Sequence, residues 1–353
     1  REKGMEPIPV AAGRRFFADE LAYGSKQDVE IVAGFGPWRH FGPKPVDEAP
    51  AADAAAYPLI RDALRMGPGG NMTLDHVFTL DSDPYLIDHC MDGKAVLPVA
   101  GALEYMAQFV GAAWPGWHVV GMRDVRQMNG IVLDGGKRAV QLRARASSHS
   151  DMHGQTVTVE IIDPQRKLPF YRATAVLLQE MPEAPQAQAP VLPGDGIAIE
   201  AAQAYGEHLF HGARFRLIER IDKLHGGGIS TTVQPSLVSG FIGGKGRWVF
   251  DLGLMDVPPQ LAFVWARVQQ DKGALPSGFG SVSRYGSGPL AGPLKLVMRL
   301  KPAPHEHAIA YDVDVIDTQG RVRIAIEDGT STMSPALNRL APNHQDFIAG
   351  LIA

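Results

Sequence analysis

The sequence predicts an α+β fold in which one plan, a long helix flanked by about five strands, is written twice. Two stretches with helical spacing, VAGALEYMAQFVGAA and VPPQLAFVWARVQ, stand far apart in the chain. Short segments that alternate apolar and polar residues surround each stretch. The 39 glycines and 27 prolines suit many short strands joined by turns. The two halves share little residue identity, so the repeat is one of architecture.

The first half is predicted to cover residues 58–180. A strand begins at Met72, in MTLDHVFTLD, and the first long helix follows Pro98 with its apolar residues on one face. The strands expected after it are WHVVGMRDV, GIVLD, AVQLRARASS, QTVTVEIID and PFYRATAVLLQ.

The second half is predicted to cover residues 197–340, after a linker at 181–196 that is rich in Pro, Ala and Gln. A short amphipathic stretch, AIEAAQAYGEHLF, precedes the second long helix, VPPQLAFVWARVQ. The expected strands are FRLIERIDKL, GISTTVQP, RWVFD, SVSRYG, LKLVMRLK, HAIAYDVDVID and VRIAIED. Residues 341–353 form a C-terminal tail.

The first 57 residues differ from the rest of the chain. Residues 13–36 predict a helix and then a strand, and residues 43–57 have the Pro- and Ala-rich composition of a linker. There is no Met at position 1 and no apolar centre of a signal peptide. We therefore expect the chain to be a piece of a longer protein.

Composition argues against several classes of function. Charged residues make up 20% of the 353 residues with a net charge of −4, and no basic cluster suggests a nucleic-acid partner. No apolar run reaches the roughly 18 residues of a membrane span. The single cysteine, Cys90, cannot form an internal disulfide, which predicts a reducing, cytoplasmic location.

The segment DHCMDGKAVLP carries the first chemical signal, H-x-x-x-G-x-x-x-x-P. His89 ends a strand-like run, where a neutral imidazole could take a proton. Gly93 permits close approach of the backbone to a ligand, and Pro98 suits the start of a helix whose amides can polarise a carbonyl. The alternative is an ordinary buried histidine beside a turn. Cys90 should point away from His89 on a strand, so we expect it to be structural.

Asp256 and Gln260 form the second signal, in DVPPQ. Pro258 and Pro259 suit the first turn of a helix, which would place Asp256 at or near the N-cap. Gln260 lies four residues on and shares its face. An apolar cleft could hold the Asp256 carboxyl protonated, ready to donate to a leaving hydroxyl. Helix capping alone would also explain the aspartate.

Two further segments are consistent with a substrate channel, and three patterns are discounted. The first is HLFHGARFRLI, which contains Phe210, His211 and Phe215 and is either a channel wall or a turn with buried rings. The second is ALPSGFGSVSRYG, a glycine-containing entry into a strand. GGG at 226–228 and GGKG at 243–246 lack the spacing of a phosphate loop. His305-Glu306-His307 has no evident third ligand, so no metal site is predicted.

In this order the four motifs resemble those of the dehydratase domains of polyketide synthases. The phrase DPYLIDHCMDGKAVLPVAGALEYMAQ is especially similar to the versions in polyunsaturated-fatty-acid and glycolipid-type synthases. The resemblance covers residues 58–335. Residues 5–36 resemble the end of the ketoreductase domain that precedes the dehydratase in such megasynthases.

The resemblance implies a double hot dog, two modules that each wrap a curved antiparallel sheet around a long helix. His89 would take the α-proton of a 3-hydroxyacyl chain carried on the phosphopantetheine of an acyl carrier protein, and Asp256 would protonate the leaving hydroxyl. The Gly93 amide would hold the thioester oxygen. No cofactor is implied, and a homodimer is plausible. The positioning residues would be Gly93, Pro98, Gln260 and His211, and the tunnel residues Leu97, Phe210 and Phe215.

The sequence departs from the family pattern at two places. His211-Gly212-Ala213 stands where relatives carry Tyr-Gly-Pro, and the pair Pro258-Pro259 is unusual beside the aspartate. Three alternatives share the fold: an enoyl isomerase, a product-template-like cyclisation domain and a non-catalytic module that docks carrier proteins. A metal hydrolase is disfavoured because the sequence shows no ligand triad.

Overall fold

The computed structural model describes residues 13–15, 17–18, 56–67, 71–150 and 154–341. Residues 13–15 and 17–18 are helical, as expected for this stretch. The rest of the predicted helix and strand within 13–36, most of the 43–57 linker and nearly all of the C-terminal tail lie outside the described residues.

One antiparallel sheet of 13 strands runs through both halves, in the order β1-β2-β6-β7-β8-β5-β12-β15-β14-β13-β11-β10-β9. The first half supplies β1 (Arg65–Met66), β2 (Met72–Thr79), β5 (His118–Gln127), β6 (Lys137–Ser150), β7 (Gly154–Ile162) and β8 (Pro169–Leu178). The second half supplies β9 (Ile197–Glu200), β10 (Ile218–His225), β11 (Gly228–Val233), β12 (Gly273–Arg284), β13 (Leu294–Lys301), β14 (Ala308–Ile316) and β15 (Val322–Ser334). A separate hairpin joins β3 (Cys90–Met91) and β4 (Lys94–Ala95).

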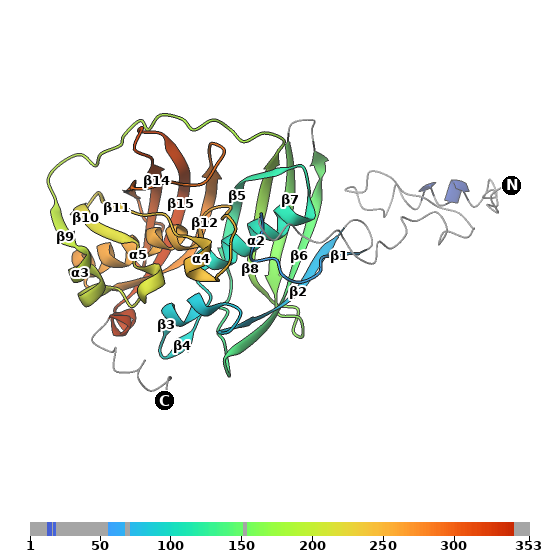
Figure 1. Cartoon of the computed structure of the whole chain (residues 1–353), viewed down its shortest axis with the longest axis horizontal. Helices are drawn as coiled ribbons and strands as arrows, with labels where there is room; N and C mark the ends of the chain where they lie inside the picture. Colours follow the sequence, from blue (N-terminus) through green and yellow to red (C-terminus); the bar gives the residue numbers. More distant parts are fainter. Residues whose placement is uncertain (1–12, 16, 19–55, 68–70, 151–153, 342–353) are drawn as a thin grey trace.

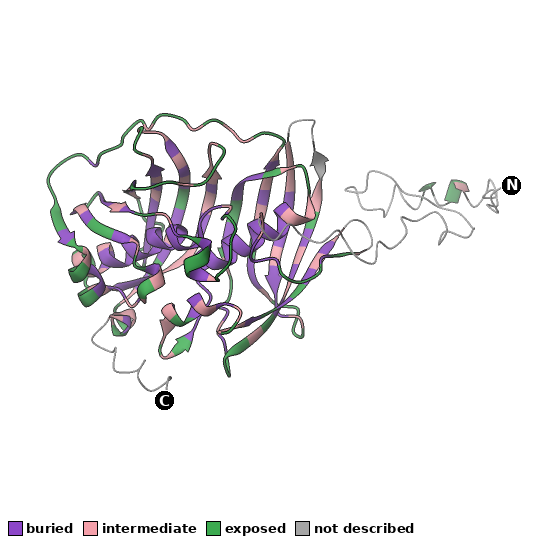
Figure 2. Cartoon of the chain, in the orientation of Figure 1, coloured by how far each residue is buried: buried purple, intermediate pink, exposed green. Residues whose placement is uncertain are grey.

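Each half wraps its part of the sheet around one long helix, α2 (Val99–Ala113) or α5 (Leu252–Gln270). Both helices lie on the same face of the sheet and contact each other (Figure 1). Their residues are buried on nearly every side, as the purple ribbon in Figure 2 shows. A helix that meets a sheet on one side and a second helix on another has to be apolar around most of its circumference.

The two halves join where β5 pairs with β12, with Met122 opposite Val282. A single hydrophobic cluster extends through both halves and includes Phe109 of α2 and Phe263 of α5. The arrangement is a double hot dog, and the predicted fold class is confirmed. None of the helices within the described residues is long and apolar enough to cross a membrane.

Three predicted strands are wrong. The strand-like run expected before His89 is instead the 3₁₀ helix η3 (Pro84–Asp88). GIVLD makes only isolated bridges, one of them between Val132 and Val96. RWVFD is irregular because side chains occupy its backbone groups: Glu104 accepts from the amides of Val249 and Phe250. The remaining short elements are α3 (Ala201–Gln203), the π-turn η4 (Ala204–His208), η5 (Ala213–Phe215), α4 (Val238–Phe241) and η6 (Pro335–Leu340).

Candidate active site

His89 directly follows η3 and is 6% exposed. Its Nδ1 lies 2.7 Å from the carbonyl oxygen of Val96. A carbonyl can only accept, so Nδ1 carries the hydrogen and the neutral ring keeps a lone pair on Nε2. The backbone supports this pose, because the amide of Val96 donates to the carbonyl of His89 at 3.0 Å. The ring is therefore held with Nε2 as its basic atom.

Asp256 lies on α5, but not at the helix start. The helix begins at Leu252, and its N-cap is Asp251, whose side chain accepts from the amide of Leu254 at 3.0 Å. Pro258 and Pro259 therefore stand inside the helix, which corrects the prediction that they open it. The prolines suggested a later start because they lack the amide that a helix interior needs. The earlier start follows from the Asp251 cap and from the burial of the apolar first turn.

Two side chains contact the Asp256 carboxylate. Nε2 of Gln260 donates to Oδ2 at 2.9 Å, and Nε2 of His211 lies 3.2 Å from the same oxygen. Tyr205 donates to Oε1 of Gln260 at 3.1 Å, which turns the amide nitrogen of Gln260 toward Asp256. The predicted spacing of Asp256 and Gln260 on one helix face thus places both in one cluster. Tyr205 was missed, because a single tyrosine in a short amphipathic stretch carries no sequence signal.

Burial and neighbouring charges set the proton affinities of this cluster. Burial lowers the pKa of His89 to about 4, against the opposing effect of the Asp256 charge. Burial alone would raise the pKa of Asp256, but the hydrogen bond from His211, the charges of His211 and His89, and the bond from Gln260 together lower it. These donors favour the ionised carboxylate, whereas apolar walls alone would favour the protonated form. The protonated carboxyl expected from the sequence therefore stays a prediction.

His89, His211 and Asp256 face one cavity between the halves. Of the predicted tunnel and positioning residues, Leu97, Pro98 and Phe210 also line it. Other wall residues are Met91, Val96, Val99, Gln127, Pro259, Phe263, Ala274, Leu275 and Pro276. Pro276 belongs to the fourth predicted motif, which thus contributes to the wall.

Three predicted residues lie outside this wall: Gln260, which contacts Asp256 from behind it, and Gly93 and Phe215. Gly93 occupies the turn of the β3–β4 hairpin with φ of 74° and does not line the cavity, so its oxyanion role stays a prediction. Phe215 is fully buried behind the site, with its ring centroid 5.6 Å from that of His89. Cys90 donates toward the carbonyl of Ile87, and burial raises its thiol pKa, which fits a structural role.

The site brings together a set of metal-ligating atoms that the sequence did not reveal. One ligand atom each from His89, His211 and Asp256 lies within 4.8 Å of the others, and all three residues are buried. The sequence showed no such set, because the three positions are far apart in the chain. His305 and His307, the pair considered from the sequence, are exposed.

Comparison with known families identifies the domain. Residues 57–163 match the family described as polyketide synthase dehydratase domain, and residues 183–341 match the one described as polyketide synthase dehydratase N-terminal domain. The two matches together include both histidines and the aspartate of the cavity. The chain belongs to the polyketide synthase dehydratases. The resemblance seen in the motifs is confirmed, and with it a dehydratase function.

The chain is also similar to one protein by sequence and to several solved structures by fold. The chain is 24% identical over 252 residues to a polyunsaturated fatty acid synthase subunit of Thraustochytrium sp., a match that covers 68% of this chain and 9% of that protein. The chain thus spans about a tenth of that relative.

Two solved structures share the fold. The dehydratase domain of a trans-AT polyketide synthase from Brevibacillus brevis aligns with a TM-score of 0.64 and 18% identity, over 81% of this chain and 100% of that domain. The dehydratase domain from the CurF module of curacin polyketide synthase aligns with a TM-score of 0.61 and 15% identity, over 79% of this chain and 100% of that domain.

Two contacts between the halves hold the dehydratase cavity together. Arg214 donates from Nη1 to Oδ2 of Asp88 at 2.5 Å, and so ties the segment after His211 to the residue before His89. Deeper in the core, the fully buried Glu104 of α2 accepts from the amides of Val249 and Phe250 at 2.6 and 2.8 Å. Both contacts fix where the second half sits relative to the first.

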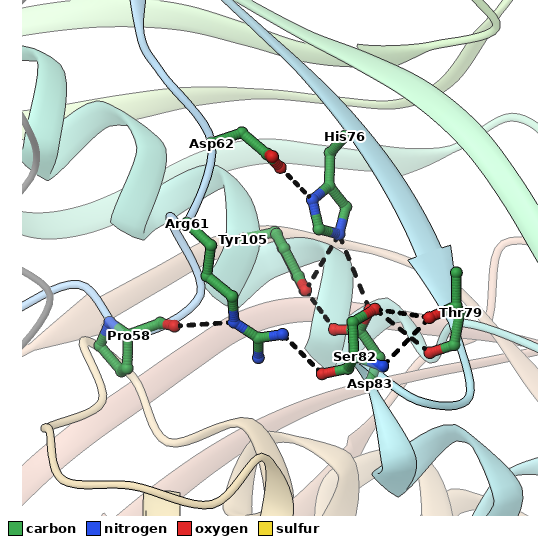
Figure 3. A network of polar contacts seen from close by, with 8 residues as sticks. All are labelled: Pro58, Arg61, Asp62, His76, Thr79, Ser82, Asp83 and Tyr105. Atoms are coloured by element: carbon green, nitrogen blue, oxygen red, sulfur yellow. Dashed lines mark hydrogen bonds and ion pairs between the residues drawn. The ribbon is translucent and has the colours of Figure 1, made fainter.

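A second polar cluster lies in the first half of the dehydratase (Figure 3), and we call it the His76 cluster. It consists of the buried residues His76, Asp83 and Tyr105 and the exposed Asp62. Nδ1 of His76 bonds Asp62 at 2.8 Å, and Tyr105 of α2 donates to Asp83 at 2.5 Å. Burial would lower the pKa of His76, but hydrogen bonds with Asp83 and Asp62 raise it. Asp83 is the N-cap of η3, so the cluster anchors the short helix that ends next to His89.

Proposed function

We propose that the domain removes water from a 3-hydroxyacyl thioester, with His89 as the base and Asp256, paired with His211, as the acid. One observation carries the proposal: a neutral imidazole from the first half and a carboxylate from the second meet in one buried cavity. Elimination of water needs a group that takes the α-proton and a second group that protonates the leaving oxygen. The cavity holds His89 for the first step and the Asp256–His211 pair for the second.

His89 has the properties of the base. Because its Nδ1–H is bound to Val96, only Nε2 can accept a proton. Burial holds its pKa near 4, which keeps the ring neutral at physiological pH. As the Cα–H bond breaks, its electron pair forms the Cα–Cβ double bond, and the Cβ–O bond breaks toward oxygen.

The acid is best described as a pair. Asp256 lies 3.2 Å from Nε2 of His211, so the two side chains are placed to share one proton. We propose that the proton held in this contact passes to the leaving oxygen to give water. His89 then releases the α-proton to solvent, and the Asp256–His211 pair takes up a proton from solvent, which restores the starting state.

The start of α2 is a second candidate for holding the thioester oxygen. The amides of Val96 and Leu97 are already bonded to His89 and Ile131. Val99, the first residue of the helix, lines the cavity, and first-turn amides of a helix have no partner within it. An oxygen that gains negative charge is stabilised by such donors.

The wider context is proposed from the relatives. One similar protein belongs to a polyunsaturated fatty acid synthase, so we propose that the substrate arrives on the phosphopantetheine of an acyl carrier protein. A ketoreductase domain would supply the 3-hydroxyl, consistent with the resemblance of residues 5–36. The proposed chemistry is redox-neutral and uses only side-chain protons, so we propose no cofactor.

The test is a mass measurement on a 3-hydroxyacyl chain attached to a carrier protein or to pantetheine. The wild-type chain should produce a species lighter by one water, with the double bond next to the carbonyl. His89→Ala and Asp256→Asn should each lower turnover by about a hundredfold or more. The exposed residues His305 and Asp195 offer matched controls, His305→Ala and Asp195→Asn, which should keep it. Normal turnover by Asp256→Asn would show that the acid is wrongly assigned, and a shifted double bond would favour an isomerase.

A further inference from the structure

The ligand atoms of His89, His211 and Asp256 lie within 4.8 Å of one another, and the three residues line one cavity. Some catalytic zinc sites use this donor set: two imidazole nitrogens and one carboxylate oxygen bind the ion, and its fourth coordination position stays open. We propose that these three side chains also bind a divalent transition-metal ion such as Zn²⁺, and that the bound ion stops dehydration.

The spacing of two of the ligands already suits such an ion. Two ligands at bond lengths of about 2.0 to 2.1 Å around a tetrahedral ion stand about 3.3 Å apart. Nε2 of His211 and Oδ2 of Asp256 are 3.2 Å apart. Only His89 has to close in, and its Nε2 is the ring nitrogen left with a lone pair by the bond to Val96. His211 binds the ion through Nε2 with its hydrogen on Nδ1, and the proton shared with Asp256 is released to solvent.

Two of the three ligands have the outer hydrogen bonds that orient metal ligands in proteins. His89 donates its other ring N–H to the carbonyl of Val96, and Asp256 accepts from Gln260. Nδ1 of His211 is buried and has no hydrogen-bond partner within the described residues. Because one outer contact is missing, we expect affinity about 10- to 100-fold below that of a fully supported site.

Inhibition follows from which atoms the ion uses. A metal on Nε2 of His89 removes the lone pair that takes the α-proton, and a metal on Asp256 and His211 displaces the acidic proton. The ion also occupies the point where the substrate hydroxyl would lie. The inhibition part rests on the proposed function, whereas the binding part does not.

Surface histidines could bind metal as well and have to be removed first. His305 and His307 are exposed, with ring centroids 6.4 Å apart. The double variant His305→Ala/His307→Ala therefore serves as the background for every measurement. The affinity of the buried site for the metal should be the same in this double variant as in the wild type.

The binding test is a titration of metal-free protein, without a histidine tag, with Co²⁺. One equivalent should produce the visible absorption of a four- or five-coordinate ion, and Zn²⁺ should abolish it. His211→Phe and His89→Phe should each weaken binding by about 100-fold or more, with near-ultraviolet circular dichroism to show that they fold. Anomalous scattering from Co²⁺-soaked crystals of the background protein locates the ion whether or not the variants fold.

An anomalous peak away from the three side chains, or equal Co²⁺ binding by folded His211→Phe, would overturn the proposal. Inhibition is tested in the dehydration assay: Zn²⁺ should abolish turnover, and a chelator should restore it. Unchanged dehydration by the Zn²⁺-loaded protein, or metal-dependent hydrolysis of the thioester, would overturn the inhibitory role. If Co²⁺ binds at the triad and the metal-free protein dehydrates no 3-hydroxyacyl substrate, the proposed function fails and the metal site stands.

Discussion

The carbonyl of Asp88 accepts a hydrogen bond from the amide of Gly212 at 2.8 Å, and so joins the residue before His89 to the residue after His211. Gly212 also packs directly against the Asp88 side chain, because a Cβ added to Gly212 would overlap the Cα, Cβ and Oδ1 of Asp88. The two histidines of the site are therefore spaced by a direct backbone contact between the halves. A glycine is needed here for its size, since its backbone is in the ordinary extended region.

Gly212→Ala should push the two halves apart at the site. We expect kcat to fall by about tenfold to a hundredfold, because small displacements of reacting groups are costly. The free energy of unfolding should fall by about 1–3 kcal/mol, as for other overpacked sites. Dehydration kinetics and urea unfolding measure the two effects. Gly206→Ala is the matched control, because nothing lies within 4 Å of its added Cβ; equal behaviour of the two variants would contradict the prediction.

Glu104→Gln should weaken the contact between α2 and the segment that precedes α5. The Glu104 carboxylate accepts from two backbone amides, and an amide group in its place would turn a donor toward one of them. The free energy of unfolding should fall by about 1–3 kcal/mol, the range for a buried donor left unsatisfied. Glu183, which is exposed, provides the control Glu183→Gln. Unchanged urea midpoints for both variants would mean that the contact contributes nothing.

His89 should make the protein less stable in acid. Burial lowers its pKa to about 4 in the folded protein, whereas the unfolded chain takes up the proton below about pH 6.5. Because the unfolded state binds more protons, stability falls as the pH drops through this window. Between pH 7 and pH 5 the wild type should lose about 2 kcal/mol more than His89→Gln. Urea unfolding at both pH values measures the difference, and parallel losses would show that His89 is not held neutral.

The His76 cluster should have the opposite pH dependence. Its hydrogen bonds with Asp83 and Asp62 raise the pKa of His76 above the unfolded value despite burial, so the stabilisation is complete below that value and disappears as the pH rises through the folded pKa. The gap in unfolding free energy between the wild type and His76→Gln should therefore be larger at pH 6 than at pH 9. The exposed His118 gives the control His118→Gln. A gap that stays constant with pH would refute a charged His76.

Local patterns in the sequence predicted much of the fold. The first long helix lies at the predicted residues 99–113, because its apolar spacing ends at a proline on one side and at aromatic, proline and glycine residues on the other. The spacing of His89 and Pro98 and of Asp256 and Gln260 also placed these residues correctly beside one cavity or cluster. Each of these predictions depended on residues within about ten positions of one another.

Features that depend on distant residues were not predicted. Glu104 stands in an apolar helix, and nothing nearby shows that its partners are 145 and 146 positions away. The lowered pKa of Asp256 has the same origin, because the donor His211 comes from a loop 45 positions earlier in the chain. The start of α5 was misplaced because the proline rule outweighed the Asp251 cap, which needed the folded surroundings to be recognised.

The seam between β5 and β12 has a consequence for how the protein could be divided. One continuous sheet has two outer edges, at β1 and β9, whereas two separate sheets would have four. A cut in the segment between β8 and β9 leaves all the hydrogen bonds of the seam in place. If the halves were made as separate chains, each would present a row of unpaired backbone groups along β5 or β12. Such fragments would recombine with each other or aggregate, so neither half is a self-sufficient building block.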